Sequence, residues 1–91
     1  MKEDIPMIIM QAVENVEKTS MAGWIEMNTA TFRLLESQTY GIPMSDEWLQ
    51  YHIEQDNSVG FYSGHPIFIA EALENNVVVV TPRLPEANAL K

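Results

Sequence analysis

The side chains best suited to acid–base chemistry near neutral pH are the two histidines, because an unperturbed imidazole titrates at about pH 6.5. His52 is followed four residues later by Asp56, a spacing that places both on one face of a helix. A carboxylate in that position could orient the imidazole as a general base. No nucleophile is tied to the pair, so we interpret it as a partly buried histidine with a local carboxylate partner rather than as a catalytic pair.

The histidines are also the obvious candidates for metal ligands, but their spacing is unfavourable. His52 and Glu54 point to different sides of a helix, and no HxxxH or HExxH pattern connects His52 with His65. The absence of cysteine removes thiolate ligands. We therefore expect no metal and no cofactor, we assign no catalytic residue, and the sequence favours a protein that is not an enzyme.

The segment 58–65 combines glycines, aromatic rings, hydroxyls and a histidine, which is typical of a loop that could bind a small molecule. Tyr62, Ser63 and His65 would line such a site if they lay at the N-terminus of a helix. A small-molecule-binding protein or a minor enzyme that uses this loop is therefore one alternative function. The alternative is a turn that needs glycine for its backbone angles, with Phe61 in the core. The glycines lack the spacing of a phosphate-binding loop or a dinucleotide fingerprint.

Acidic residues lie near aromatic residues in the sequence, and together they could form a pocket for an organic cation. Trp24, Trp48 and Tyr51 are the rings, and the nearby acids are Glu26, Glu47 and Glu54. Packing in the core explains tryptophans at these positions about equally well. The predicted ligand-binding set, which joins these rings to the segment 58–65, is Trp24, Trp48, His52, Tyr62, Ser63 and His65.

The charge is strongly acidic, with 13 Asp and Glu against 5 Lys and Arg and a net charge of -8. A surface that binds phosphates needs clustered basic residues, and here they are scattered. We therefore expect no direct nucleic-acid binding. An acidic mimic of nucleic acid, which would inhibit a basic protein, is one alternative function. Solubility explains the negative charge without a partner.

Length and composition predict one small folded unit. A chain of 91 residues with 46% hydrophobic residues has room for one domain, whose stability alone is modest. The absence of cysteine and of a targeting pattern predicts a cytoplasmic protein. The aliphatic run Val77 to Val80 is too short to cross a bilayer, so we expect no membrane association.

Four helices are predicted from hydrophobic periodicity and capping residues. The first runs from Ile5 to about Thr19, with Asp4 as its N-cap and a wide apolar face that suits burial on two sides. The second covers the run after Asn28 until Gly41 and Pro43, the third begins at Ser45, and the fourth begins at His65 and ends near Asn75 or Asn76.

Two strands are predicted from β-branched and aromatic content. Trp24 to Met27 forms one, although a hairpin with Phe32 to Leu35 is an alternative to the second helix. Val77 to Thr81 forms the other, ended by Pro82. Phe61-Tyr62 belongs to a loop or a very short strand.

The combined prediction is an α+β domain over residues 1–82, with three or four short helices on a small sheet, followed by a tail or short helical turn over 83–91. The surplus of apolar surface predicts that a second copy completes the sheet. The leading functional interpretation is a non-enzymatic interaction or adaptor protein that forms a homodimer and binds other proteins. The predicted interface residues are Ile5, Ile8, Ile9, Val77 and Val79.

Overall fold

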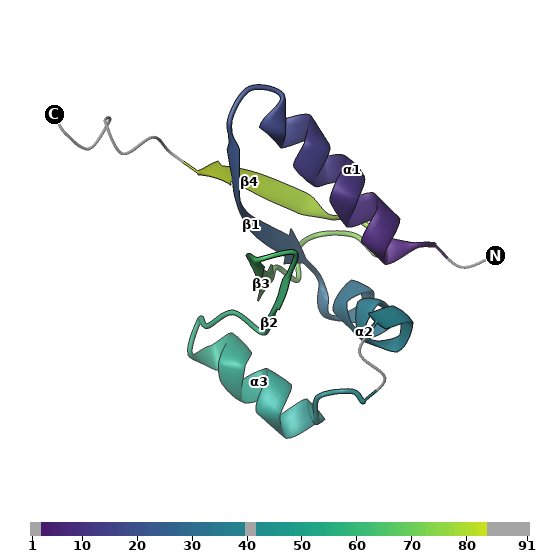
Figure 1. Cartoon of the computed structure of the whole chain (residues 1–91). Coiled ribbons are helices and arrows are strands. Elements are labelled where there is room, and N and C mark those ends of the chain that lie inside the picture. Colours follow the sequence, from purple (N-terminus) through teal and green to yellow (C-terminus); the bar gives the residue numbers. More distant parts are fainter. Residues whose placement is uncertain (1–2, 40–41, 84–91) are drawn as a thin grey trace, which may run out of the picture.

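The structure is a computed structural model that describes residues 3–39 and 42–83 (Figure 1). Within these residues three helices pack on a four-stranded mixed sheet, which is an α+β fold and confirms the predicted class. In chain order the elements are α1 (Ile5–Glu17), β1 (Met21–Met27), α2 (Thr29–Thr39), α3 (Asp46–Glu54), β2 (Gly60–Tyr62), β3 (His65–Ile69) and β4 (Val79–Arg83).

The strands lie in the order β2-β3-β1-β4, so β1 is paired on both sides. β1 runs parallel to β3, with Ile25 beside Ile67, and antiparallel to β4, with Ile25 beside Val80. β2 and β3 form an antiparallel hairpin. The side chains of Ile25, Ile67 and Val80 are all buried, which places the centre of the core on one face of this three-strand row.

α1 covers that face, as the periodicity predicts. Ile5, Ile9 and Val13 form its buried stripe, and the helix contacts β1, β4 and α2. Its N-terminus is capped by Asp4, whose side chain accepts a hydrogen bond from the amide of Met7 at 3.2 Å. The helix lies beside β4 in Figure 1.

Of the two alternatives for the segment after β1, the helix is present and the hairpin is not. Phe32 and Leu35 are buried on α2. The third predicted helix is also confirmed. Ser45 caps α3 by accepting a hydrogen bond from the amide of Trp48 at 3.1 Å.

The predicted fourth helix is wrong, because His65–Ile69 is the strand β3 and residues 70–78 form turns. Pairing with β1 buries Ile67 completely. The stabilisation from this burial outweighs the local preference for a helix that a proline at the first helical position indicates. The short strand at Phe61-Tyr62 is present within β2.

The last strand is displaced from its predicted position. It runs from Val79 to Arg83 instead of Val77 to Thr81, and Pro82 lies inside it. β4 is an edge strand, where a residue without an N–H group is tolerated. The tail predicted for 83–91 falls, apart from Arg83, outside the described residues.

An ion-pair network holds the segment before α3 against α2. Glu36 is buried and accepts a hydrogen bond from Arg33 at 2.8 Å and from the amide of Met44 at 2.8 Å. Arg33 also binds Asp46 at 2.6 Å and the carbonyl oxygen of Met44. The hydrogen bond and the negative charge of Glu36, followed by those of Asp46, raise the pKa of Arg33.

We expect Arg33→Ala to lower the free energy of unfolding by about 3 kcal/mol, because Glu36 would be left as a buried carboxylate without its cation. Urea denaturation followed by circular dichroism measures this change. Asp46→Asn is the control, since Asp46 is 96% exposed in its ion pair with the same arginine and its loss should have little effect. Equal effects of the two substitutions would contradict the role given to Glu36.

No helix among the described residues is long and apolar enough to cross a membrane. Completion of the sheet by a second copy stays a prediction.

Candidate functional site on the uncovered face of the sheet

The sheet has one face toward the core and one face toward solvent. Because side chains alternate along a strand, burial of Ile25 and Met27 on β1 places Trp24 and Glu26 on the opposite face. The strand register brings neighbours from the other strands beside them. We call this set the open face, and it consists of Trp24, Glu26, Phe61, Pro66, Phe68, Val79, Thr81 and Arg83.

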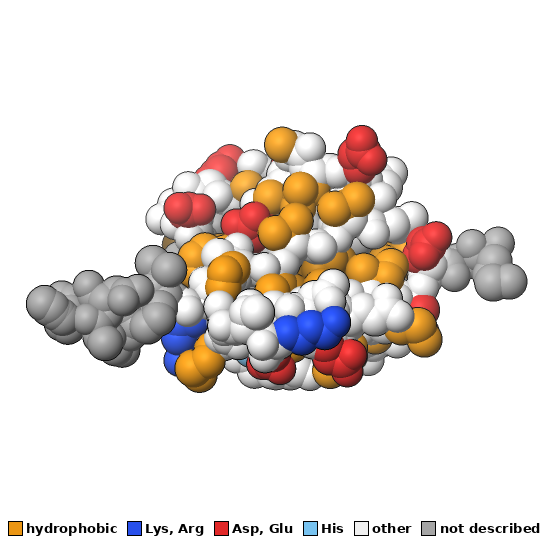
Figure 2. Space-filling model, turned by 90° about the horizontal axis from the view of Figure 1, so that it is seen from above, with side chains coloured by type: hydrophobic (Ala, Val, Ile, Leu, Met, Phe, Trp, Pro, Cys, Tyr) orange, Lys and Arg blue, Asp and Glu red, His pale blue; other side chains and the backbone are white. Residues whose placement is uncertain are grey.

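The open face is rich in exposed apolar groups. Trp24 is 38% exposed, Phe61 60% and Val79 38%. Other large hydrophobic side chains are exposed elsewhere on the chain. Figure 2 shows hydrophobic side chains over the middle of the molecule as seen from above, with acidic and a few basic side chains around them. Several exposed apolar groups on one sheet face mark a surface suited to contact with another molecule.

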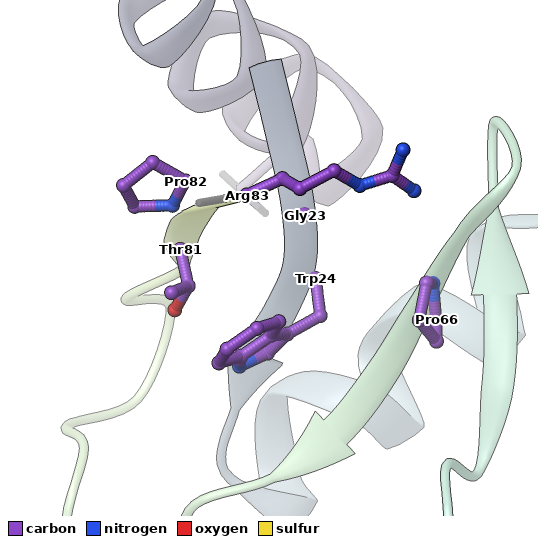
Figure 3. A pocket seen from close by; sticks show the side chains of 6 residues that line it. All are labelled: Gly23, Trp24, Pro66, Thr81, Pro82 and Arg83. Carbon is purple, nitrogen blue, oxygen red and sulfur yellow. The ribbon is translucent and has the colours of Figure 1, made fainter. Parts of the chain in front are cut away.

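A hollow of about 520 Å³ opens on this face between β3, β1 and β4 (Figure 3). Its lining residues are Gly23, Trp24, Pro66, Thr81, Pro82 and Arg83. The Arg83 side chain extends from β4 across β1 in Figure 3. Gly23 allows the two strands to approach closely here, because a Cβ atom at this position would lie 2.8 Å from the carbonyl oxygen of Thr81.

A second hollow of about 330 Å³ shares Trp24 with the first. It is lined by Trp24, Glu26, Asp56, Phe68 and Ile69. The indole Nε1 of Trp24 donates a hydrogen bond to Glu26 at 3.1 Å, which fixes the ring beside the carboxylate. Two carboxylates next to two aromatic rings are suited to a cation, and a guanidinium can also stack on the rings. We call this the acidic hollow.

The predicted ligand-binding residues do not meet in one place. Trp24 lines both hollows, but neither of them includes any of the others, which are Trp48, His52, Tyr62, Ser63 and His65. Trp48 lies on α3, where it stacks on Tyr51 with ring centroids 5.4 Å apart and meets His52 edge-on at 4.7 Å. Trp24 shares neither of these two hollows with Trp48 or Tyr51.

The hairpin residues take the conformation of a turn. Ser63 and Gly64 have φ values of 51° and 82°, which glycine favours, and Tyr62 packs against the core. His65 lies on β3 rather than at a helix N-terminus, and its Nδ1 is 3.4 Å from the carbonyl oxygen of Gly23. Phe61 is exposed, in contrast to the core position expected for it.

The predicted pair of His52 and Asp56 is not formed, because the buried Nδ1 of His52 has no hydrogen-bond partner among the described residues. Asp56 instead lines the acidic hollow. Its φ of 59° belongs to the left-handed region, which ends α3 and turns the chain toward β2.

Burial separates the predicted interface residues into two groups. Ile5 and Ile9 are fully buried in the core of this chain, and Ile8 is partly buried against it. Val77 and Val79 are exposed, and Val79 belongs to the open face. A contact through Val77 and Val79 stays a prediction.

The sequence reasoning missed Pro66, Phe68 and Arg83 as members of the candidate site. Pro66 and Phe68 are two residues apart, so they share one face of a strand. Their spacing would have indicated this face if His65–Ile69 had been interpreted as a strand.

The N-terminus of α2 is a second place where a ligand could be sought, because helix N-termini attract anions. This position is already filled by Glu71, which accepts hydrogen bonds from the amide of Thr29 at 2.9 Å and from its hydroxyl at 2.5 Å. Asn28 adds an N-cap by accepting a hydrogen bond from the amide of Thr31. The contacts therefore tie the connection between β3 and β4 to α2.

The hydrogen bonds from the hydroxyl and the amide of Thr29 lower the pKa of Glu71 below its ordinary value of 4.5. A carboxylate with a lowered pKa in the folded state stabilises the fold above its unfolded pKa and loses this contribution as the pH falls through the folded pKa. We expect Glu71→Ala to lower the free energy of unfolding at pH 7 by less than about 1 kcal/mol. The difference from the wild type should shrink below pH 4.5.

Chemical denaturation between pH 3 and pH 7 measures this dependence. Glu74→Ala is the matched control, because Glu74 is an exposed acid in the same connection whose side chain makes no ion pair with another described residue. A Glu71 effect that is constant over the whole pH range would contradict the role of its charge.

Among the described residues there is no group of three or more His, Asp and Glu side chains arranged to hold a metal ion. No protein-family model matches the sequence, and no curated protein or solved structure gives a significant match.

Proposed function

We propose that this protein is a non-enzymatic interaction module that associates with a second copy of itself through the open face. The observation that carries the proposal is the exposure of Trp24, Phe61 and Val79 on the sheet face opposite the buried Ile25. A sheet in a small domain normally buries its apolar face against another layer. A second copy would supply that layer.

The composition of the open face supports a protein partner. Tryptophan and arginine are the residues that most often contribute large shares of binding energy at interfaces. Trp24 lies between the two hollows, and Arg83 lies at the end of the larger one. The hollow offers space for side chains of the opposing copy, and its walls are mainly apolar.

We expect Trp24→Lys to raise the dissociation constant of the dimer by roughly 30-fold, because it places a hydrated charge in the centre of the contact. Sedimentation velocity over a range of concentrations measures the constant. Trp48→Lys is the matched control, since Trp48 is 53% exposed but lies on α3 outside both hollows. Circular dichroism checks that both variants are folded.

A second test uses tryptophan fluorescence and conservative substitutions, because the chain has two tryptophans. In Trp48→Phe the only indole is Trp24, and its emission should move to shorter wavelength as the protein is concentrated and the ring leaves water. In Trp24→Phe the only indole is Trp48, and its emission should not change. A wild-type chain that stays monomeric at all concentrations up to hundreds of micromolar would refute the proposed function.

A further inference from the structure

We propose that in this dimer Arg83 of each copy occupies the acidic hollow of the other copy, between Glu26 and Asp56. The inference rests on the proposed function and goes further by assigning the polar contacts that set the orientation of the two copies. It follows from the positions of opposite charges on the open face.

The charges lie toward opposite ends of the face. Arg83 is four residues from Val79 along β4, and Val79 is paired with Glu26 of β1. At a rise of roughly 3.3 Å per residue, this places the basic row and the acidic row about 13 Å apart. Trp24 lies between them and lines the hollow at each end.

This arrangement is self-complementary under two-fold symmetry. If two open faces pack together about a two-fold axis that lies in the plane of contact and across the strands, the strands of the two copies run in opposite directions. The Arg83 row of one copy then lies over the Glu26 row of the other, and the two Trp24 side chains meet near the axis. Each charge pair occurs twice, as in any isologous dimer.

The groups involved are available for such a contact. Arg83 is exposed and makes no ion pair with another described residue, whereas Arg33 is engaged by Glu36 and Asp46. Glu26 accepts one hydrogen bond, from Trp24, and this leaves its second carboxylate oxygen for a guanidinium. Asp56 is exposed at the edge of the acidic hollow.

The net charge gives the contact a further role. Two copies with a charge of -8 each repel one another. Placing a guanidinium of one copy between two carboxylates of the other offsets this repulsion where the surfaces are closest. Alignments that bring the acidic hollows together would oppose carboxylates, so the charges favour one register of the two faces.

The test is a charge exchange between two variants. We expect Arg83→Glu, and separately the double variant Glu26→Arg with Asp56→Arg, each to raise the dissociation constant of its own dimer by roughly tenfold or more. In an equimolar mixture of these two variants, a heterodimer should form. The side chain at position 83 of each copy then faces groups of opposite charge at positions 26 and 56 of the other copy. Sedimentation equilibrium with one variant carrying a fluorescent label measures the heterodimer.

The control for the mixture is Glu47→Arg with Glu54→Arg, which changes the net charge by the same amount but on α3, outside both hollows. Mixed with Arg83→Glu, it should recover less heterodimer than the Glu26 and Asp56 variant does. Equal recovery by the two double variants would show a general charge effect and overturn the inference.

The outcomes separate the two proposals. If the wild type dimerises and Trp24→Lys prevents this while Arg83→Glu does not, the open face is the interface and the Arg83 contact is wrong. If the wild type does not dimerise, the proposed function itself is wrong, and the inference fails with it. High salt should bring the dissociation constants of the wild type and Arg83→Glu closer together, because salt screens both the ion pairs of the wild type and the opposed carboxylates of the variant. A ratio of the two constants that does not change with salt would contradict the contact.

Discussion

The pairing of β1 with strands from two distant parts of the chain is the constraint on which the structure depends. Ile25 lies between Ile67 of β3 and Val80 of β4, and all three side chains are buried in the core. The parallel pair requires the chain to travel from one end of β1 back to the start of β3, and α2 and α3 lie in that crossover. The positions of α2 and α3 in the chain therefore follow from the parallel pairing of β1 with β3.

The same strand explains why the molecule has an uncovered face. Side chains that alternate along β1 must leave Trp24 and Glu26 on the side opposite to Ile25. With α1 packed on the core side, the described helices leave the opposite side open at Trp24 and its neighbours. The open face thus follows from a two-layer arrangement in a short chain, and its tryptophan, hollow and separated charges give it the properties of a binding surface.

The buried and partly buried polar side chains hold the connections between helices and strands in place. Glu36 is satisfied by Arg33 and the amide of Met44, and it ties the approach to α3 onto α2. Asn28 donates hydrogen bonds to the carbonyl oxygen of Leu73 and to Asn75, so it holds the long connection between β3 and β4. These side chains are therefore engaged in contacts within the fold, whereas the candidate site is built from exposed groups of the sheet.

Local sequence patterns were sufficient for the elements whose signals lie within a few residues. The stripe of Ile5, Ile9 and Val13 with its Asp4 cap determined α1, and Ser45 with the following acids determined the start of α3. The acidic charge and the absence of cysteine are likewise properties of the sequence alone. Each of these features depends on spacing or composition, which the chain carries whether or not it is folded.

Tertiary structure decided whatever depends on a partner far away in the chain. His65–Ile69 became a strand because Ile67 pairs with Ile25, a contact between residues that local propensity cannot connect. Trp24 and Trp48 are equivalent in the sequence analysis, yet the fold places one on the open face and the other on α3. The sequence by itself determined the apolar stripes of the helices and the net charge. Long-range strand pairing decided which side chains of the sheet share a surface. The reason is that strand register, not distance along the chain, determines which residues are neighbours in a sheet.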